Sequence, residues 1–143
     1  MEIIELTSPL TAQQVADLLA LMPELDAKIA VTADMLQAAV ADPATHQFAA
    51  VEDGHIVGTA SLCIGHSPTG RKGGIEDVVV SSVFRGRHLG RMLMEHIIAF
   101  ARERLAPIEL HLTSRPFRKN ANRLYQAVGF QPYETNVYKF PIE

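Results

Sequence analysis

Residues 75–94 combine the residue types that a phosphate-binding site needs. A run of β-branched residues, typical of a strand, leads into a turn that contains Gly86 and Gly90 and then into a helical pattern. The first backbone N–H groups of a helix are unpaired and lie at the positive end of its dipole, so they attract an anion, which glycines let come close. Three nearby cations add charge: Arg85, Arg87 and Arg91. The alternative interpretation is an arginine-rich helix start that meets only solvent.

Two common nucleotide-binding motifs are absent. The chain has no G-x-x-x-x-G-K-[ST], which argues against a P-loop NTPase, and no G-x-G-x-x-G, which argues against a dinucleotide-binding Rossmann unit. Residues 85–90, Arg-Gly-Arg-His-Leu-Gly, instead resemble the acetyl-CoA signature of the GNAT superfamily of N-acetyltransferases, Arg/Gln-x-x-Gly-x-Gly/Ala, with His88 where the family has Gly. Downstream, residues 121–130 match a second family pattern, A-x-x-L/F-Y-x-x-x-G-F, in the expected order. Residues 75–90 are also similar to the glucosamine-6-phosphate N-acetyltransferase branch.

This resemblance implies an activity and a set of contacts. The expected activity is direct transfer of an acetyl group from acetyl-CoA to a primary amine of a small molecule, with no covalent enzyme intermediate and no metal. Val78, Val79 and Val80 are expected to offer backbone groups to the pantetheine arm of CoA. The residues expected around the rest of CoA are Arg85, Gly86, Arg87, His88, Leu89, Gly90, Arg91 and Asn120. The alternatives are a non-catalytic acyl-CoA-binding sensor or, more narrowly, an acetyltransferase specific for an amino-sugar phosphate.

Three side chains are candidates for the proton transfers of this reaction. Tyr125 occupies the position of the family's tyrosine, and a phenol with a pKa of about 10 can protonate a leaving thiolate. The alternative is a core tyrosine on an amphipathic helix. Glu76 and Asp77 are candidates for the base that takes a proton from the amine, and neighbours in a strand normally point to opposite faces. We therefore expect one of them to face the cleft, with Glu76 preferred and Asp77 as the alternative or as the residue that orients substrate. An edge charge or a salt bridge would explain both acids equally well.

The charge is divided unevenly along the chain. Residues 1–70 contain one Lys or Arg against nine Asp or Glu, a net charge of −8, whereas residues 71–143 contain twelve against seven, a net charge of +5. The basic half favours an anionic partner. A nucleic acid is disfavoured, because the formal net charge is −3, aromatic residues make up only 6%, and no binding motif is present. A sugar phosphate would need a cationic pocket, for which Arg71, Lys72 and Arg115 are candidates.

The pattern of the chain predicts a single domain, 1–143, of the α/β (α+β) class: a GNAT-like, mixed and mostly antiparallel sheet flanked by about four helices. Thr11 and Gln14 form a capping-box pattern, and Asp53-Gly54 suits the turn of a hairpin. The expected strands are 2–6, 46–52, 55–64, 75–80, 108–113 and one or two within 130–140. The expected helices begin at Thr11 and span 32–41, 88–104 and 117–128, and a mobile loop is expected over 66–74. The helix over 88–104 should bury Leu89, Met92, Leu93, Ile97 and Phe100.

The remaining features exclude several classes. Cys63 is alone, so it cannot form an internal disulfide, and we expect it to be a small buried residue. No Cys/His spacing suggests zinc, and no apolar run is long enough for a bilayer. The acidic start of the chain is unlike a signal peptide, so we expect a cytoplasmic protein. The resemblance suggests a homodimer.

Overall fold

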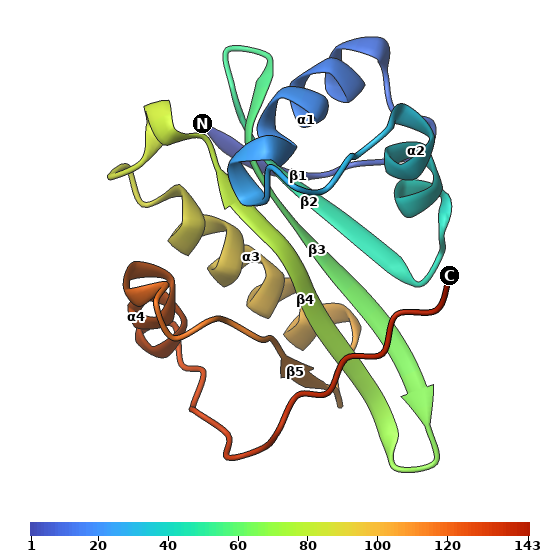
Figure 1. Ribbon diagram of the computed structural model, residues 1–143, viewed down its shortest axis with the longest axis vertical. Coiled ribbons are helices and arrows are strands. Elements are labelled where there is room, and N and C mark those ends of the chain that lie inside the picture. The colour runs from blue at the N-terminus through green and yellow to red at the C-terminus, as the bar shows by residue number, and fades with distance from the viewer. The chain divides into compact units, whose positions relative to one another are not determined.

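The computed structural model describes all 143 residues, which form two compact units, Met1–Thr113 and Ser114–Glu143, described here separately (Figure 1). The strands of the first unit are β1 (Glu2–Glu5), β2 (Thr45–Glu52), β3 (His55–Ser67), β4 (Gly70–Val80) and β5 (Glu109–His111). Its helices are α1 (Ala12–Leu25), α2 (Ala33–Ala41), α3 (Leu89–Arg104) and a short 3-10 turn, η1 (Ser82–Phe84). The second unit contains α4 (Lys119–Ala127).

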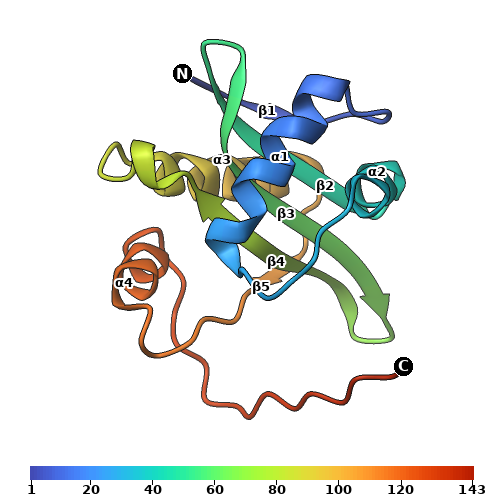
Figure 2. The ribbon, with the colours of Figure 1, turned by 45° about the horizontal axis from the view of Figure 1, so that its top comes forward.

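The five strands form one sheet in the order β1-β2-β3-β4-β5. Neighbouring strands are antiparallel except β4 and β5, which are parallel. Helices α1 and α2 lie on one face of the sheet and α3 lies on the other (Figure 2). The predicted mixed α/β fold with four helices is therefore confirmed. No helix is both long enough and apolar enough to cross a membrane, and no group of three or more His, Cys, Asp or Glu side chains could hold a metal ion.

Side chains near its N-terminus determine where α1 begins and what it packs against. The predicted capping box is present, because Thr11 and Gln14 each accept a hydrogen bond from the other's backbone N–H. One turn later, Asp17 Oδ2 accepts a hydrogen bond of 3.0 Å from the backbone N–H of Ile56, and Oδ1 lies 3.2 Å from Nδ1 of His55. Asp17 thus ties α1 to the first residues of β3.

Replacing Asp17 by Asn is expected to lower the free energy of unfolding at pH 7 by roughly 1–2 kcal/mol, because a charge-assisted bond becomes a neutral one. Burial raises the pKa of Asp17, but the hydrogen bonds from Ile56, His55 and Gln13 outweigh it, so the pKa is lowered on balance. A lowered pKa stabilises the fold above the carboxyl's unfolded pKa of about 3.9, and this stabilisation is lost as the pH falls through the folded value. Urea denaturation should show the wild type and variant converging at low pH. A difference that persists there, or one equal to that of exposed Asp34→Asn, would contradict this role.

The core on the far face forms between the sheet and α3. Phe48 is fully buried and packs edge to face against Phe100 of α3, with ring centroids 5.2 Å apart. The helix buries Leu89, Leu93, Met94, Ile97 and Ala101. Of the predicted stripe, Leu89, Leu93 and Ile97 are buried and Phe100 is half-buried, whereas Met92 is 37% exposed and Met94 is buried instead. Met92 and Met94 each adjoin Leu93 in the sequence, so helical periodicity alone separates them poorly.

Two predictions about the ends of the sheet are wrong. Residues 66–74 are not a loop, because β3 and β4 continue through them as a hairpin and turn only at Pro68 and Thr69. Their glycine-rich composition is typical of a loop, but the backbone N–H and C=O groups of the two strands pair with each other across the hairpin. Cys63 is exposed rather than buried, because the continuous burial of β3 ends at Leu62.

The second unit consists of α4 and extended chain. Ala121, Leu124, Tyr125 and Val128 are half-buried, as expected for the inner face of this helix, and Gly129, with a φ of +112°, ends it. The strands predicted within 130–140 are absent. The alternating pattern there has no strand partner, and Tyr133, Tyr138 and Phe140 are each more than 85% exposed.

Candidate functional site

Strand β4 carries a β-bulge at its acidic residues. Between two paired positions, β3 has one residue, Ala60, whereas β4 has two, Asp77 and Val78. Asp77 adopts a φ of +52°, a left-handed conformation that few residues other than glycine take. An extra residue in one strand interrupts the alternation of side chains and can re-aim one of them.

The bulge places both acids on the face of the sheet that α1 and α2 cover. Glu76 is the cross-strand partner of Ser61, whose hydroxyl lies in a pocket on that face, and Asp77 lines the same pocket. The alternation expected of neighbours in a strand is therefore broken at these two residues, which share a face of the sheet. Both carboxylates are exposed to solvent, so neither needs a buried cation to compensate it.

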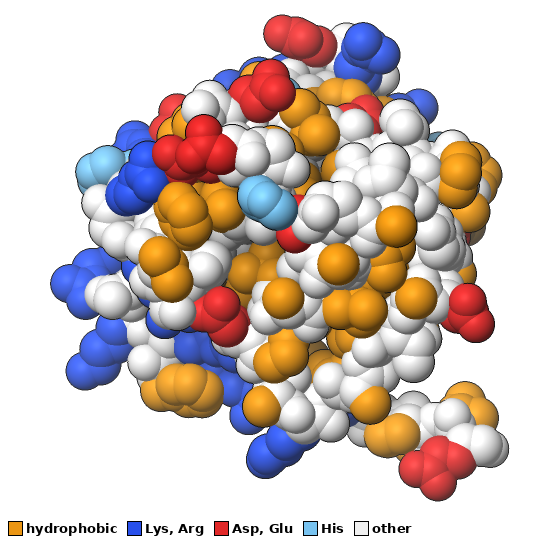
Figure 3. Space-filling view, turned by 90° about the horizontal axis from the view of Figure 1, so that it is seen from above, with side chains coloured by type: hydrophobic (Ala, Val, Ile, Leu, Met, Phe, Trp, Pro, Cys, Tyr) orange, Lys and Arg blue, Asp and Glu red, His pale blue; other side chains and the backbone are white.

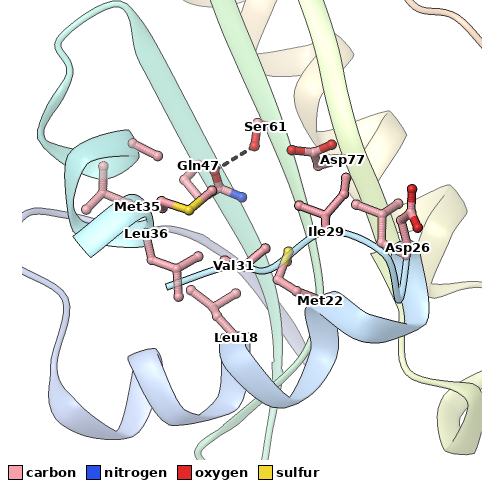
Figure 4. Close-up of a pocket in the computed structure, with 13 residues that line it drawn as sticks. Leu18, Met22, Asp26, Ile29, Val31, Met35, Leu36, Gln47, Ser61 and Asp77 are labelled. Atoms are coloured by element: carbon pink, nitrogen blue, oxygen red, sulfur yellow. Dashed lines mark hydrogen bonds between the residues drawn. The ribbon is translucent and has the colours of Figure 1, made fainter. Parts of the chain in front are cut away.

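The pocket lies between α1, the segment that follows it, α2 and the sheet, and has a volume of about 160 Å³ (Figure 4). Its apolar walls are formed by Leu18, Met22, Leu25, Ile29, Val31, Met35, Leu36, Ala39 and Val40. The polar residues that line it are Asp26, Gln47, Ser61 and Asp77. Of the two candidate bases, Asp77 lines this pocket and Glu76 does not.

A buried hydrogen-bond chain forms the floor of the pocket. The Ser61 hydroxyl donates to Oε1 of Gln47 (2.6 Å), Nε2 of Gln47 donates to Oγ1 of Thr59 (2.7 Å), and the Thr59 hydroxyl donates to the backbone carbonyl of Phe48 (2.7 Å). Sequence reasoning missed these residues. Polar Thr59 and Ser61, alternating in an otherwise apolar strand, were the available signal.

Glu76 lies beside the pocket, where β4 and β5 meet. A Cβ placed on Gly74 would lie 3.6 Å from Oε1 of Glu76 and 3.4 Å from Nε2 of His111, so both side chains lie over Gly74. Cys63 pairs with Gly74 across the sheet. Partial burial, together with the charges of Glu76 and Asp77, raises the pKa of the Cys63 thiol. Cys63 is therefore a poor source of thiolate at neutral pH.

Strands β4 and β5 separate after three paired residues. Their last pair is Gly74 with His111, and β5 ends there. From Ile75 to Val80, β4 has no strand partner on the edge away from β3. The backbone of Val78, Val79 and Val80 therefore has no strand partner on that edge, where an extended ligand could pair with it.

The loop after β4 leads directly into the N-terminus of α3. Gly86 has a φ of +83°, and a side chain added there would meet no other atom within 4 Å of its Cβ. The backbone at Gly86 is therefore accessible to a ligand. His88, which stands where the family pattern has Gly, adopts the left-handed conformation that glycine takes most easily (φ 60°, ψ 23°). No side chain caps α3, so its first backbone N–H groups, at Leu89, Gly90 and Arg91, remain available to an anion.

Each arginine of this loop and of the first turn of α3 has an acidic partner. The ion pairs join Arg85 to Glu24 (4.0 Å), Arg87 to Glu52 (2.9 Å) and Arg91 to Glu95 (2.6 Å). All three arginines are about half exposed or more, so these pairs contribute little stability, and a multiply charged anion could compete for the guanidinium groups. Two of the partners belong to the acidic half of the sequence, which accounts for part of the charge division.

Glu24 also positions the loop itself. Its Oε1 accepts a hydrogen bond of 2.8 Å from the backbone N–H of Ser82, at the start of η1. This bond, with smaller contributions from the Ser82 side chain and Arg85, lowers the pKa of Glu24. The C-terminal turn of α1 thus holds the segment that connects β4 to the N-terminus of α3.

Tyr125 and Asn120 belong to α4 in the second unit. Burial raises the pKa of the Tyr125 phenol, and the nearby Arg118 opposes this in part. The Asn120 Oδ1 accepts a hydrogen bond of 2.9 Å from Arg123 on the next turn of the helix. Sequence reasoning did not single out Asn122, whose amide donates to the carbonyls of Arg115 and Arg118 and so holds the segment that precedes α4.

Comparison with known protein families gives a match over most of the chain. The model of the acetyltransferase (GNAT) family matches residues 12–130. The chain belongs to the GNAT acetyltransferase family. The match spans both units and includes both sequence motifs on which the resemblance was based. No curated protein matches the chain.

Solved structures of other GNAT proteins share the fold. A putative acetyltransferase from Agrobacterium tumefaciens has a TM-score of 0.84 and 23% identity, covering 99% of this chain and 100% of that one. A ribosomal-protein-alanine N-acetyltransferase from Brucella melitensis has a TM-score of 0.77 and 20% identity, covering 98% and 100%. The acetyltransferase AAC(6')-Iy, in complex with the bisubstrate analogue CoA-S-monomethyl-acetylneamine, has a TM-score of 0.80 and 16% identity, covering 99% and 97%. At these identities the likeness concerns the fold.

Proposed function

We propose that this acetyltransferase uses acetyl-CoA to acetylate a primary amine of a small molecule. One observation carries the proposal: the bulge in β4 puts the Asp77 carboxylate into a pocket, and β4 then continues as a free edge toward an anion-binding helix start. A single strand thus connects a place for an amine with a place for a nucleotide thioester.

The residues around the loop suit CoA. The free edge of β4 can hydrogen-bond the amides of the pantetheine arm through Val78, Val79 and Val80. The N–H groups at the start of α3 and the open backbone at Gly86 suit a pyrophosphate. Arg85, Arg87 and Arg91 add charge if they exchange their acidic partners for phosphate. Bound acetyl-CoA supplies an activated acyl group with a thiolate as leaving group.

Asp77 is the better placed of the two candidate bases. An alkylamine with a pKa near 10 arrives protonated and must lose a proton before its nitrogen can attack. Asp77 lines the pocket and can take that proton directly or through water, whereas Glu76 lies beside the pocket and over Gly74. We therefore assign the base to Asp77 and keep Glu76, with His111 beside it, as the alternative that mutagenesis separates.

Tyr125 is proposed as the acid that protonates the leaving thiolate. The proposal rests on its place in the family pattern and on the chemistry of the phenol. Because burial raises its pKa, Tyr125 keeps its proton across the neutral range and can donate it. With the Cys63 thiol also held protonated, no activated nucleophile lies on this face of the sheet, which favours direct transfer.

A sugar phosphate is a weaker candidate for the acceptor. None of the residues that line the pocket is a lysine or arginine. Arg71 donates a hydrogen bond to the carbonyl of Leu105 at the end of α3, and Lys72 donates to Thr69 in the hairpin turn. Two of the three cations considered for a phosphate therefore already have other partners.

Acetyl-CoA at about 100 times its dissociation constant is expected to stabilise the native state by about 2.7 kcal/mol through mass action. For a domain of this size, that corresponds to a rise in melting temperature of about 10 °C. Differential scanning fluorimetry measures the shift, and acetyl phosphate, which carries the acetyl group without the nucleotide, should give none. No shift at millimolar acetyl-CoA, or an equal shift with acetyl phosphate, would overturn the assignment of the cosubstrate.

A further inference from the structure

The walls of the pocket beside Asp77 are apolar, and their chemistry restricts what can bind there. The volume of about 160 Å³ is close to that of a dry cavity of about 150 Å³ that holds one benzene molecule. We propose that the acceptor is a small amine whose nitrogen is attached to a hydrocarbon group about the size of a six-membered ring. This inference rests on the proposed function and deepens it by naming the class of substrate.

The hydrogen-bond chain beneath the pocket determines what Ser61 offers to a ligand. Thr59 uses its only hydrogen on the carbonyl of Phe48, so its oxygen accepts from the amide nitrogen of Gln47. That contact orients Gln47 with its oxygen toward Ser61, and Ser61 must donate its own hydrogen there. The lone pairs of Ser61 Oγ are left to accept, so Ser61 can bind an N–H group of the substrate.

Ser61 and Asp77 therefore form a pair of acceptors at one end of an apolar pocket. Figure 4 shows the Asp77 carboxylate beside Ser61, whose hydroxyl is bonded to Gln47, with Val31, Ile29 and Met22 along the pocket below them. An ammonium group carries several N–H donors and a positive charge, which suits one carboxylate and one hydroxyl oxygen. In the face shown in Figure 3, hydrophobic side chains gather around the centre of the view, where Lys and Arg side chains are mostly absent.

The same walls disfavour a polyhydroxylated amine. The side chains below the acceptor pair, such as Leu18, Val31 and Leu36, have no group that could hydrogen-bond a hydroxyl. A sugar hydroxyl buried there would lose its water without gaining a partner. An amine of the same ring size with no hydroxyl groups suffers no such loss.

Steady-state acetylation of three amines by the wild-type enzyme tests this inference. Cyclohexylamine and glucosamine have six-membered rings of similar size and differ mainly in hydroxyl groups, and glucosamine 6-phosphate adds an anion. We expect kcat/KM for cyclohexylamine to exceed that for glucosamine by about 100-fold or more. If glucosamine or its phosphate is acetylated as well or better, this inference is wrong while the proposed function stands. If no amine is acetylated although acetyl-CoA binds, the proposed function fails as well.

A pair of variants on α2 tests the pocket independently. Ala39 lines the pocket, whereas its neighbour Ala38 is exposed and does not. Ala39→Leu fills part of the space, so we expect KM for cyclohexylamine to rise at least about 10-fold, KM for methylamine to change far less, and KM for acetyl-CoA to stay the same. Ala38→Leu changes the same helix equally in propensity and should leave all three unchanged. A KM for cyclohexylamine that is insensitive to Ala39→Leu, with melting temperatures alike, would contradict the assignment.

Discussion

Asp77→Asn is expected to lower kcat/KM for amine acetylation by about 100-fold or more, the usual contribution of a positioned general base. The substitution keeps the size of the side chain and removes its ability to take a proton. Asp77 lines the pocket, whereas the proposed CoA contacts are made by the unpaired backbone of Val78–Val80. Acetyl-CoA binding should therefore be unchanged. Initial rates with cyclohexylamine and the thermal shift with acetyl-CoA measure the two effects separately.

Two further variants decide what the loss means. Asp34 is exposed in the first turn of α2, so Asp34→Asn makes the same chemical change away from the pocket and should leave the rate unaltered. Glu76→Gln removes the alternative base. A loss that is larger with Glu76→Gln than with Asp77→Asn would transfer the role to Glu76, which stands over Gly74 beside His111.

Tyr125→Phe is expected to lower kcat by about 100-fold while KM for acetyl-CoA stays nearly constant. Phenylalanine keeps the ring and the packing of α4 but cannot donate a proton. Since burial raises the pKa of Tyr125, the wild-type enzyme should keep its acid protonated throughout the neutral range. Single-turnover kinetics, which exclude product release, measure the effect on the transfer step.

A tyrosine elsewhere in the same unit provides the control for Tyr125. Tyr133 is 87% exposed, so Tyr133→Phe should have no effect on the rate. An unchanged kcat in Tyr125→Phe, with the fold intact by circular dichroism, would remove Tyr125 as the acid. A large rise in KM for acetyl-CoA with normal kcat would instead indicate a binding role.

Local features of the sequence were sufficient to predict most elements of the fold. The capping box at Thr11, the hairpin turn at Asp53-Gly54 and the glycine-containing start of α3 each depend on residues within one turn of one another. The loop that we propose as the anion site was predictable for the same reason. Its position after a β-branched strand is a property of contiguous sequence.

The features that sequence could not supply depend on pairing between distant residues. The bulge at Asp77 is a shift in register between β3 and β4, so nothing within β4 shows that Glu76 and Asp77 share a face. The pairing of 66–67 with 70–71 likewise turned an expected loop into a hairpin. Strands were expected within 130–140 from the alternation of apolar and polar residues alone. A strand also needs a neighbouring strand to pair with, and none pairs with this segment.

The division of charge now has a physical explanation in part. Glu24 and Glu52, from the acidic half, form ion pairs with Arg85 and Arg87 in the basic half. Part of the negative charge of the first half therefore neutralises these two arginines. Asp26 and Asp77 give the acceptor pocket its only formal charges, and both are negative. A cationic amine and an anionic nucleotide can thus be attracted to separate sites in the first unit.

Quantitative product analysis tests the central claim most directly. The enzyme is incubated with acetyl-CoA carrying a ¹³C-labelled acetyl group and with cyclohexylamine, and mass spectrometry quantifies the labelled amide alongside the free CoA thiol. We expect one labelled N-cyclohexylacetamide for each thiol released, and loss of both products in Asp77→Asn. Thiol release without amide, or binding of acetyl-CoA with neither product from any amine, would contradict it.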